Sequence, residues 1–213
     1  KLAKEQVKAG IARRNDEPSG IARREAMKAV FGPDHPMART PEYDSIASVT
    51  SQDMVDFHAD WFHPDRMYLV VIGDFESKEM IAKIEAAFAG WEKATKPLPA
   101  DPEIPAYPRT VNVVDKSDLT QTTVFMGHKG IRADNPNYAG VQVANRILGG
   151  DFTSRINMNL REDKSWSYGA RTLFVNSRGQ RPWLVYAPVQ TDKTMESLQE
   201  LEKEFDQYLG TKP

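Results

Sequence analysis

The sequence of 213 residues contains no cysteine. This absence excludes disulfides, iron–sulfur clusters, thiolate zinc sites and cysteine nucleophiles together. Long hydrophobic runs are also missing, because the longest apolar stretch, Met67 to Ile72, has six residues and a membrane-spanning helix needs about 20. The charges nearly balance, with 28 Lys and Arg against 30 Asp and Glu. A net charge of −2 gives no electrostatic reason to expect nucleic acid or an acidic membrane as a partner.

Several catalytic signatures are absent as well. The sequence has no phosphate-binding loop, no G-x-S-x-G elbow and no G-x-G-x-x-G dinucleotide motif. Among only four histidines, His58 and His63 are five residues apart, so on one helix they would point about 140° away from each other. A helical zinc pair, as in H-x-x-E-H, is four residues apart. We therefore expect no catalytic residue and no metal ligand in this chain.

Hydrophobic residues make up 40% of the chain, which is enough for a packed core. Apolar spacing and helix-start residues predict helices over 1–14, 19–30, 50–61, 77–88, 135–148, 154–161 and 192–208. Strand-like runs lie at 67–72, 110–115, 121–128, 168–175 and 183–189, the last two joined by a turn at 177–179. This mixture predicts an α+β fold.

The segment 96–108 holds five prolines in thirteen residues, which is typical of an extended, semi-rigid linker. It is the strongest domain boundary in the sequence. The one convincing strand before it, 67–72, cannot satisfy its backbone groups alone. We therefore expect the chain to cut through two α+β domains.

A set of short motifs in collinear order resembles the pitrilysin/insulinase-like metallopeptidases, the inverzincins, which include the mitochondrial processing peptidases. The motifs cover nearly the whole chain, and the string Leu-Gly-Gly, Ser-Arg, Leu-Arg-Glu and Tyr-Gly is the most specific part. The matching positions are Phe31 to Pro36, Thr40 to Glu42, Phe57-His58, Phe62 to Pro64, Met67 to Asp74, Asp115-Lys116, Leu119 to Gln121, Gly127-His128, Ile131, Asp134 to Pro136, Ile147 to Gly150, Ser154-Arg155, Leu160 to Glu162 and Tyr168-Gly169.

The resemblance implies two-layer α/β sandwich domains of the processing-peptidase type. Residues 1–95 would be the C-terminal half of a first domain, 96–108 the proline-rich linker, and 109–213 the N-terminal half of a second, non-catalytic domain. The family's H-x-x-E-H would lie upstream of Lys1, and its counterpart in the second domain would fall between Gly130 and Gly150, where there is no His and no Glu. A further glutamate ligand would align near Ala9 and Gly10, which cannot bind metal. The resemblance therefore places zinc only in another domain or in a partner.

Arg161 and Tyr168 are the candidate substrate-binding residues. The resemblance implies that such a pair, seven residues apart, holds the substrate backbone across a central cavity. A guanidinium can donate two parallel hydrogen bonds to a carbonyl, and a phenol supplies another. The alternative is structural: Arg161 would pair with Glu162 or Asp163 at a helix end, and Tyr168 would fill a strand face. Nearby Trp166 departs from the family pattern and is either a packed aromatic or part of the cavity wall.

The resemblance implies that the chain is inactive alone and holds extended peptide or unfolded protein for a zinc-bearing homologous domain or subunit. Two alternatives stay open. The parent protein could itself be an active zinc endopeptidase, or the chain could be a structural assembly subunit that binds no peptide. The family also favours a bacterial periplasmic or cell-envelope location.

Overall fold

The computed structural model describes residues 1–117, 119–176 and 178–211. The chain forms two compact units. Unit 1 consists of residues 1–41 and 101–213, and unit 2 consists of residues 42–100. Unit 1 contains the sheet and the larger core, so it is the unit that positions the candidate site.

The sheet of unit 1 has three antiparallel strands: β1 (Gln121–His128), β2 (Arg171–Phe174) and β3 (Trp183–Gln190), in the order β1-β3-β2. Its central strand, β3, pairs along its whole length with β1, from Gln190 opposite Gln121 to Trp183 opposite His128. On its other edge, four residues of β3 pair with β2. The strands are rich in β-branched and aromatic residues, which favour the pleated conformation.

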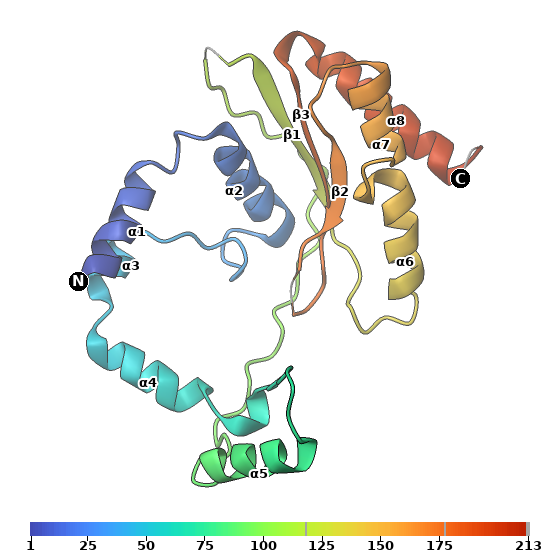
Figure 1. The fold of residues 1–213 in the computed structure, drawn as a ribbon. Helices are drawn as coiled ribbons and strands as arrows, with labels where there is room; N and C mark the ends of the chain where they lie inside the picture. Colours follow the sequence, from blue (N-terminus) through green and yellow to red (C-terminus); the bar gives the residue numbers. More distant parts are fainter. Residues whose placement is uncertain (118, 177, 212–213) are drawn as a thin grey trace. The chain divides into compact units, whose positions relative to one another are not determined.

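Both faces of the sheet are covered by helices. Val185, Ala187 and Val189 alternate along β3 and share one face, as the two-residue period of a strand requires. Against that face pack α7 (Arg155–Asn157), the π-helix η3 (Met158–Asp163) and α8 (Thr194–Leu209). Leu184 points to the other face, where α2 (Pro18–Phe31) packs. Figure 1 shows α2 on one side of the sheet and α6, α7 and α8 on the other.

The remaining helices of unit 1 are α1 (Leu2–Ala12), α6 (Tyr138–Asn145), the π-helix η2 (Arg146–Gly150) and the 3-10 helix η4 (Thr191–Lys193). Gly149 explains how closely η2 approaches the sheet. A Cβ at this position would lie 2.6 Å from Thr172 Oγ1 of β2, a separation that real Cβ atoms do not show. The paired glycines therefore end the helix and also let it contact the strand.

A polar network fixes η3 and α7 to α8. Asn159 Nδ2 donates to carboxylate oxygens of Glu200 and Glu204, at 2.9 Å each. Arg155 Nε donates to Glu204 at 3.0 Å, and Lys203 Nζ to Glu200 at 2.9 Å. The hydrogen bonds from Asn159 and then from Lys203 lower the pKa of Glu200 below its ordinary value of 4.5.

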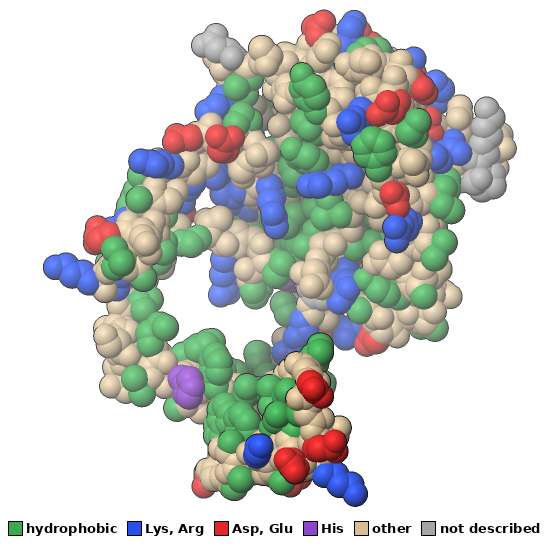
Figure 2. Space-filling model, in the orientation of Figure 1, with side chains coloured by type: hydrophobic (Ala, Val, Ile, Leu, Met, Phe, Trp, Pro, Cys, Tyr) green, Lys and Arg blue, Asp and Glu red, His purple; other side chains and the backbone are tan. Residues whose placement is uncertain are grey.

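Unit 2 contains α3 (Tyr43–Ser48), α4 (Ser51–Trp61), the 3-10 helix η1 (Pro64–Arg66) and α5 (Ser77–Phe88). Helix α4 begins with the predicted capping box, in which Asp53 N–H donates to Thr50 Oγ1 at 3.2 Å and Thr50 N–H donates to Asp53 Oδ2 at 2.6 Å. Many apolar side chains of this unit are exposed, and Figure 2 shows them gathered over α4 and α5.

Two predicted strands are wrong. Residues 67–72 and 110–115 are not in strands, and all six side chains of Met67 to Ile72 are exposed, Tyr68 completely. An apolar run of this length is typical of a strand buried on both faces. A strand needs a neighbour for its backbone groups, and neither segment pairs with another within the described residues.

The predicted α+β class is confirmed by the mixture of helices with a small antiparallel sheet. The compact units divide the chain differently from the domains expected at 1–95 and 109–213, and that boundary stays a prediction. Within the proline-rich segment, Ile104 is buried against Met27 and Phe31 of α2. Residue 177 of the predicted turn lies outside the described residues. None of the helices described is long and apolar enough to cross a membrane.

Two leucines of α8 provide a matched test of the core. Leu201 is 1% exposed and packs in the core, whereas Leu209 at the end of the helix is 85% exposed. We predict that Leu201→Ala lowers the free energy of unfolding by about 2–5 kcal/mol, because it leaves a cavity. Leu209→Ala should change it by less than about 0.5 kcal/mol. Urea denaturation followed by circular dichroism measures both, and equal effects would contradict this packing of α8.

The lowered pKa of Glu200 predicts a pH dependence. Its stabilising contribution is fully present above the pKa of the unfolded chain and is lost as the pH falls through the lower folded pKa. Glu200→Gln should therefore be less stable than wild type near neutral pH, and the difference should shrink toward about pH 3. Urea midpoints at both pH values measure this. Glu202→Gln on the same helix is the control, because Glu202 forms no ion pair within the described residues. This variant should show no such convergence.

Candidate functional site

Arg161 lies in the π-helix η3, where its guanidinium is held from two sides. Its carbon Cζ lies 4.5 Å from the centre of the Phe152 ring, a cation–π distance. Its Nε lies 3.3 Å from Glu162 Oε1. The side chain is still partly exposed, so the guanidinium has a preferred position and remains accessible to a ligand. The ion pair with Glu162 is the one that the structural alternative predicted.

Tyr168 lies between η3 and β2 and points into solvent. Its side chain is 87% exposed, and its hydroxyl makes no hydrogen bond within the described part of the chain. It therefore does not fill a strand face, as the structural alternative required. A tyrosine carries a large apolar ring, and leaving it in water provides no packing stabilisation.

The turn between these two residues has a defined backbone. Ser165 adopts a positive φ of 56°, the left-handed conformation that often ends a helix and is uncommon for residues other than glycine. Ser165 N–H donates to the Arg161 carbonyl at 3.1 Å, and Trp166 N–H donates to the Leu160 carbonyl at 2.9 Å. Trp166 is half-buried against the core, so the packed-aromatic interpretation fits this residue. The structure thus places Arg161 and Tyr168 on two sides of one ordered turn, and no hydrogen bond joins them within the described residues.

The segment that follows the turn is anchored to the sheet by Ser167. Its hydroxyl donates to the Pro188 carbonyl at 2.5 Å and accepts from Gly169 N–H at 3.1 Å. Ser167 also forms an isolated bridge with Val189 of β3. The backbone on either side of Tyr168 is therefore held, while its side chain is not. Sequence reasoning did not identify Ser167, because a single serine before a strand carries no spacing signal.

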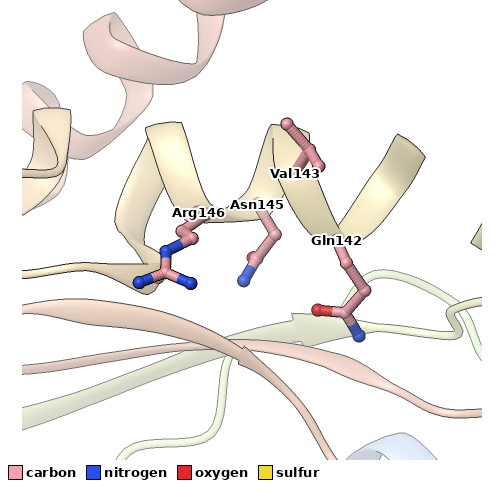
Figure 3. A pocket seen from close by; sticks show the side chains of 5 residues that line it. Gln142, Val143, Asn145 and Arg146 are labelled. Atoms are coloured by element: carbon pink, nitrogen blue, oxygen red, sulfur yellow. The ribbon is translucent and has the colours of Figure 1, made fainter. Parts of the chain in front are cut away.

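The region 130–150, where a zinc motif would align in a catalytic domain, holds helix α6 and a cavity of about 310 Å³ lined by Gln142, Val143, Asn145, Arg146 and Gly150. Figure 3 shows Gln142, Asn145 and Arg146 directed toward the sheet and Val143 directed away from it.

The polar groups that line this cavity already have partners. Asn145 Oδ1 accepts from Trp183 Nε1 at 2.6 Å, and Arg146 pairs with Asp151 at 2.8 Å. Zinc requires imidazole, thiolate or carboxylate ligands, and none of the five lining residues supplies one. The cavity therefore does not fit zinc.

The other positions considered for metal are equally unsuited. The ring of His58 in α4 stacks on the ring of Phe62, the residue that follows the helix. His63 Nδ1 lies 3.0 Å from the Glu92 carbonyl oxygen. Ala9 and Gly10 lie in α1, whose Glu5 pairs with Lys8 at 3.1 Å. Over the described residues, no group of three or more His, Cys, Asp or Glu side chains could hold a metal ion.

Comparison with known proteins identifies the family. The sequence model of the Peptidase M16 inactive domain matches residues 48–212. The chain is 27% identical over 157 residues to the uncharacterized zinc protease YmxG of Bacillus subtilis, covering 72% of this chain and 37% of that protein. It is 24% identical over 142 residues to the probable inactive metalloprotease YmfF of the same organism, covering 65% of this chain and 32% of that one. The chain thus spans less than half the length of both relatives.

A solved structure supports the same fold. The crystal structure of a peptidase M16 inactive domain from Pseudomonas fluorescens superposes with a TM-score of 0.82 at 24% sequence identity, covering all of this chain and 52% of that chain. The family match covers well over half of the residues, and the matched region contains both Arg161 and Tyr168. The chain belongs to the M16 peptidase family, within the group described as its inactive domain.

Proposed function

We propose that this chain is the substrate-holding, non-catalytic part of an M16 peptidase, which binds extended peptide for a zinc-bearing homologous domain or subunit. The observation that carries the proposal is the exposure of Tyr168 on a fixed backbone, one turn away from an accessible Arg161. Neither side chain contributes much to the core. An arginine and a tyrosine at the surface of an ordered turn are instead suited to bind a polar ligand.

The chemistry favours a peptide main chain as that ligand. The guanidinium can donate two hydrogen bonds in a plane, which matches carbonyl oxygens of an extended backbone. The phenol can donate or accept, so it suits either a carbonyl or an amide. Stacking on Phe152 orients the guanidinium before the peptide arrives, which reduces the entropy lost on binding. Contacts to backbone atoms carry no side-chain preference, so the bound peptides would be diverse in sequence.

A division of labour between two domains is consistent with the described residues, among which no metal-binding group occurs. In the family, the zinc ion supplies an activated water for hydrolysis. The cavity beside α6 cannot hold zinc, so this chain would bind and orient the peptide while the hydrolytic step takes place in another domain. The partner of this chain would then be a homologous, zinc-bearing domain, whether it lies in the same polypeptide or in a second one.

Peptide binding by Arg161 variants tests the proposal. Arg161→Ala should weaken binding of a fluorescein-labelled unstructured peptide by about 1–3 kcal/mol, the cost of a lost charged hydrogen bond. Tyr168→Phe, which removes only the hydroxyl, should cost about 0.5–1.5 kcal/mol. Fluorescence anisotropy gives the dissociation constants. Arg178→Ala, which removes another exposed arginine that is paired with an acidic residue, is the control and should bind as wild type. Unchanged affinity in both site variants would remove the proposal and favour the assembly-subunit alternative.

The metal assignment has its own test. We predict that the chain, after dialysis against zinc-containing buffer and then zinc-free buffer, retains no stoichiometric zinc and cleaves no peptide. Elemental analysis of the dialysed protein measures the metal, and a quenched fluorescent peptide measures cleavage. A stoichiometric zinc content would show that the described side chains, none of which form a ligand group, rearrange to bind it.

A further inference from the structure

Asn157, at the end of α7, is a buried polar residue that uses both ends of its amide. It is 4% exposed. Its Nδ2 donates to the Phe152 carbonyl at 2.6 Å, and its Oδ1 accepts from Ala170 N–H at 3.1 Å. A carbonyl can only accept and an N–H can only donate, so the orientation of the amide is fixed by its two partners.

These two partners lie in the two segments, the supports, that hold the candidate binding residues in place. Phe152 is the residue whose ring lies under the Arg161 guanidinium. Ala170 follows Tyr168 by two residues, and a Cβ added at the intervening Gly169 would lie only 3.6 Å from Asn157 Oδ1. The backbone just after Tyr168 therefore rests against the Asn157 side chain. One amide thus ties the turn that carries the ring partner of Arg161 to the segment that carries Tyr168.

Each of the two supports has a second attachment of its own. The Phe152 turn is also held by Asp151, whose Oδ1 accepts from Phe152 N–H at 2.7 Å while Oδ2 accepts from Arg146 Nε at 2.9 Å. The Tyr168 segment is also held to β3 by Ser167. These attachments fix each support separately. Asn157 is the side chain that hydrogen-bonds to both of them.

We propose that Asn157 is a positioning residue that sets the spacing of Arg161 and Tyr168 for binding a peptide. This inference rests on the proposed function. Two hydrogen-bonding groups bind an extended chain together only when their separation matches the spacing of its carbonyls, and an error of about 1 Å can cost a large factor in binding or rate. A buried amide with both ends fixed holds that separation because neither end can move without leaving a buried polar group unpaired.

Asn157→Asp keeps one of the two hydrogen bonds and removes the other. The carboxylate still accepts from Ala170 N–H, but it places an oxygen against the Phe152 carbonyl, where no donor remains. We expect the folded variant to bind the labelled peptide about tenfold more weakly than wild type near neutral pH. When the pH is lowered, the buried carboxyl becomes protonated at a pKa above the usual range for aspartate, and its O–H can donate to Phe152 again. The affinity of the variant should then rise toward that of wild type measured at the same pH.

The controls separate positioning from stability. Met27→Ala removes a buried side chain of α2, in the core cluster on the other face of the sheet, which includes no residue of either support. It should lower the urea midpoint but leave the affinity of the folded fraction unchanged. Asn157→Thr carries no charge, and its single, shorter hydroxyl cannot reach both partners of the asparagine amide, so it should bind weakly at every pH. If Asn157→Asp does not fold at neutral pH, Asn157→Thr still tests the inference.

The outcomes are distinguishable from those that test the proposed function. If Arg161→Ala and Tyr168→Phe weaken binding while folded Asn157→Asp and Asn157→Thr bind as wild type, the positioning role is wrong and the proposed function stands. If none of the four variants changes the affinity, the proposed function itself fails. Weakened binding by both Asn157 variants, with recovery at low pH for Asn157→Asp only, supports the positioning role.

Discussion

The pairing of β3 on both of its edges is the constraint on which the rest of unit 1 depends. One edge binds β1 and the other binds β2, and beyond β2 the same strand receives the Ser167 bridge at Val189. Gln190 N–H, at the end of β3, donates to the Trp166 carbonyl at 2.9 Å. The turn that separates Arg161 from Tyr168 is therefore held in a fixed position against the central strand. Helices α7, η3 and α8 pack on the same strand through Val185, Ala187 and Val189, so η3, which carries Arg161, is also positioned relative to it.

Much of the fold follows from local patterns in the sequence. The prediction for β1 matches the strand at both ends, and the helices at 19–30, 50–61 and 77–88 lie within a residue or two of α2, α4 and α5. Capping residues, proline at a helix start and apolar spacing act within one or two turns, so the sequence contains all of the relevant physics. Met67 to Ile72 fails as a strand because a strand is defined by its neighbour, and periodicity in one segment carries no information about what lies beside it.

The candidate site divides in the same way. Arg161 and Tyr168 were identified by resemblance to a family, and their hydrogen-bonding capacity follows from the residue types. Their supports were not identified. Asn157, Ser167 and Phe152 interact through backbone carbonyls and amides of residues up to 21 positions away. Such contacts depend on backbone geometry, and no spacing rule in the sequence reports them. In the sequence, an asparagine in a short helix gives no indication of the role that its partners reveal in the structure.

The exposed run from Met67 to Ile72 has a consequence for association between copies of the chain. Six consecutive apolar residues, several of them β-branched or aromatic, lie exposed with no charge and no proline among them. An exposed apolar run can pair with the same segment of another molecule, which is the geometry of intermolecular β-sheet formation. Asp65 and Arg66 precede the run and Asp74 follows it, and charges flanking an apolar strand oppose its stacking. This exposed apolar segment lies in unit 2, whereas the proposed recognition chemistry belongs to unit 1.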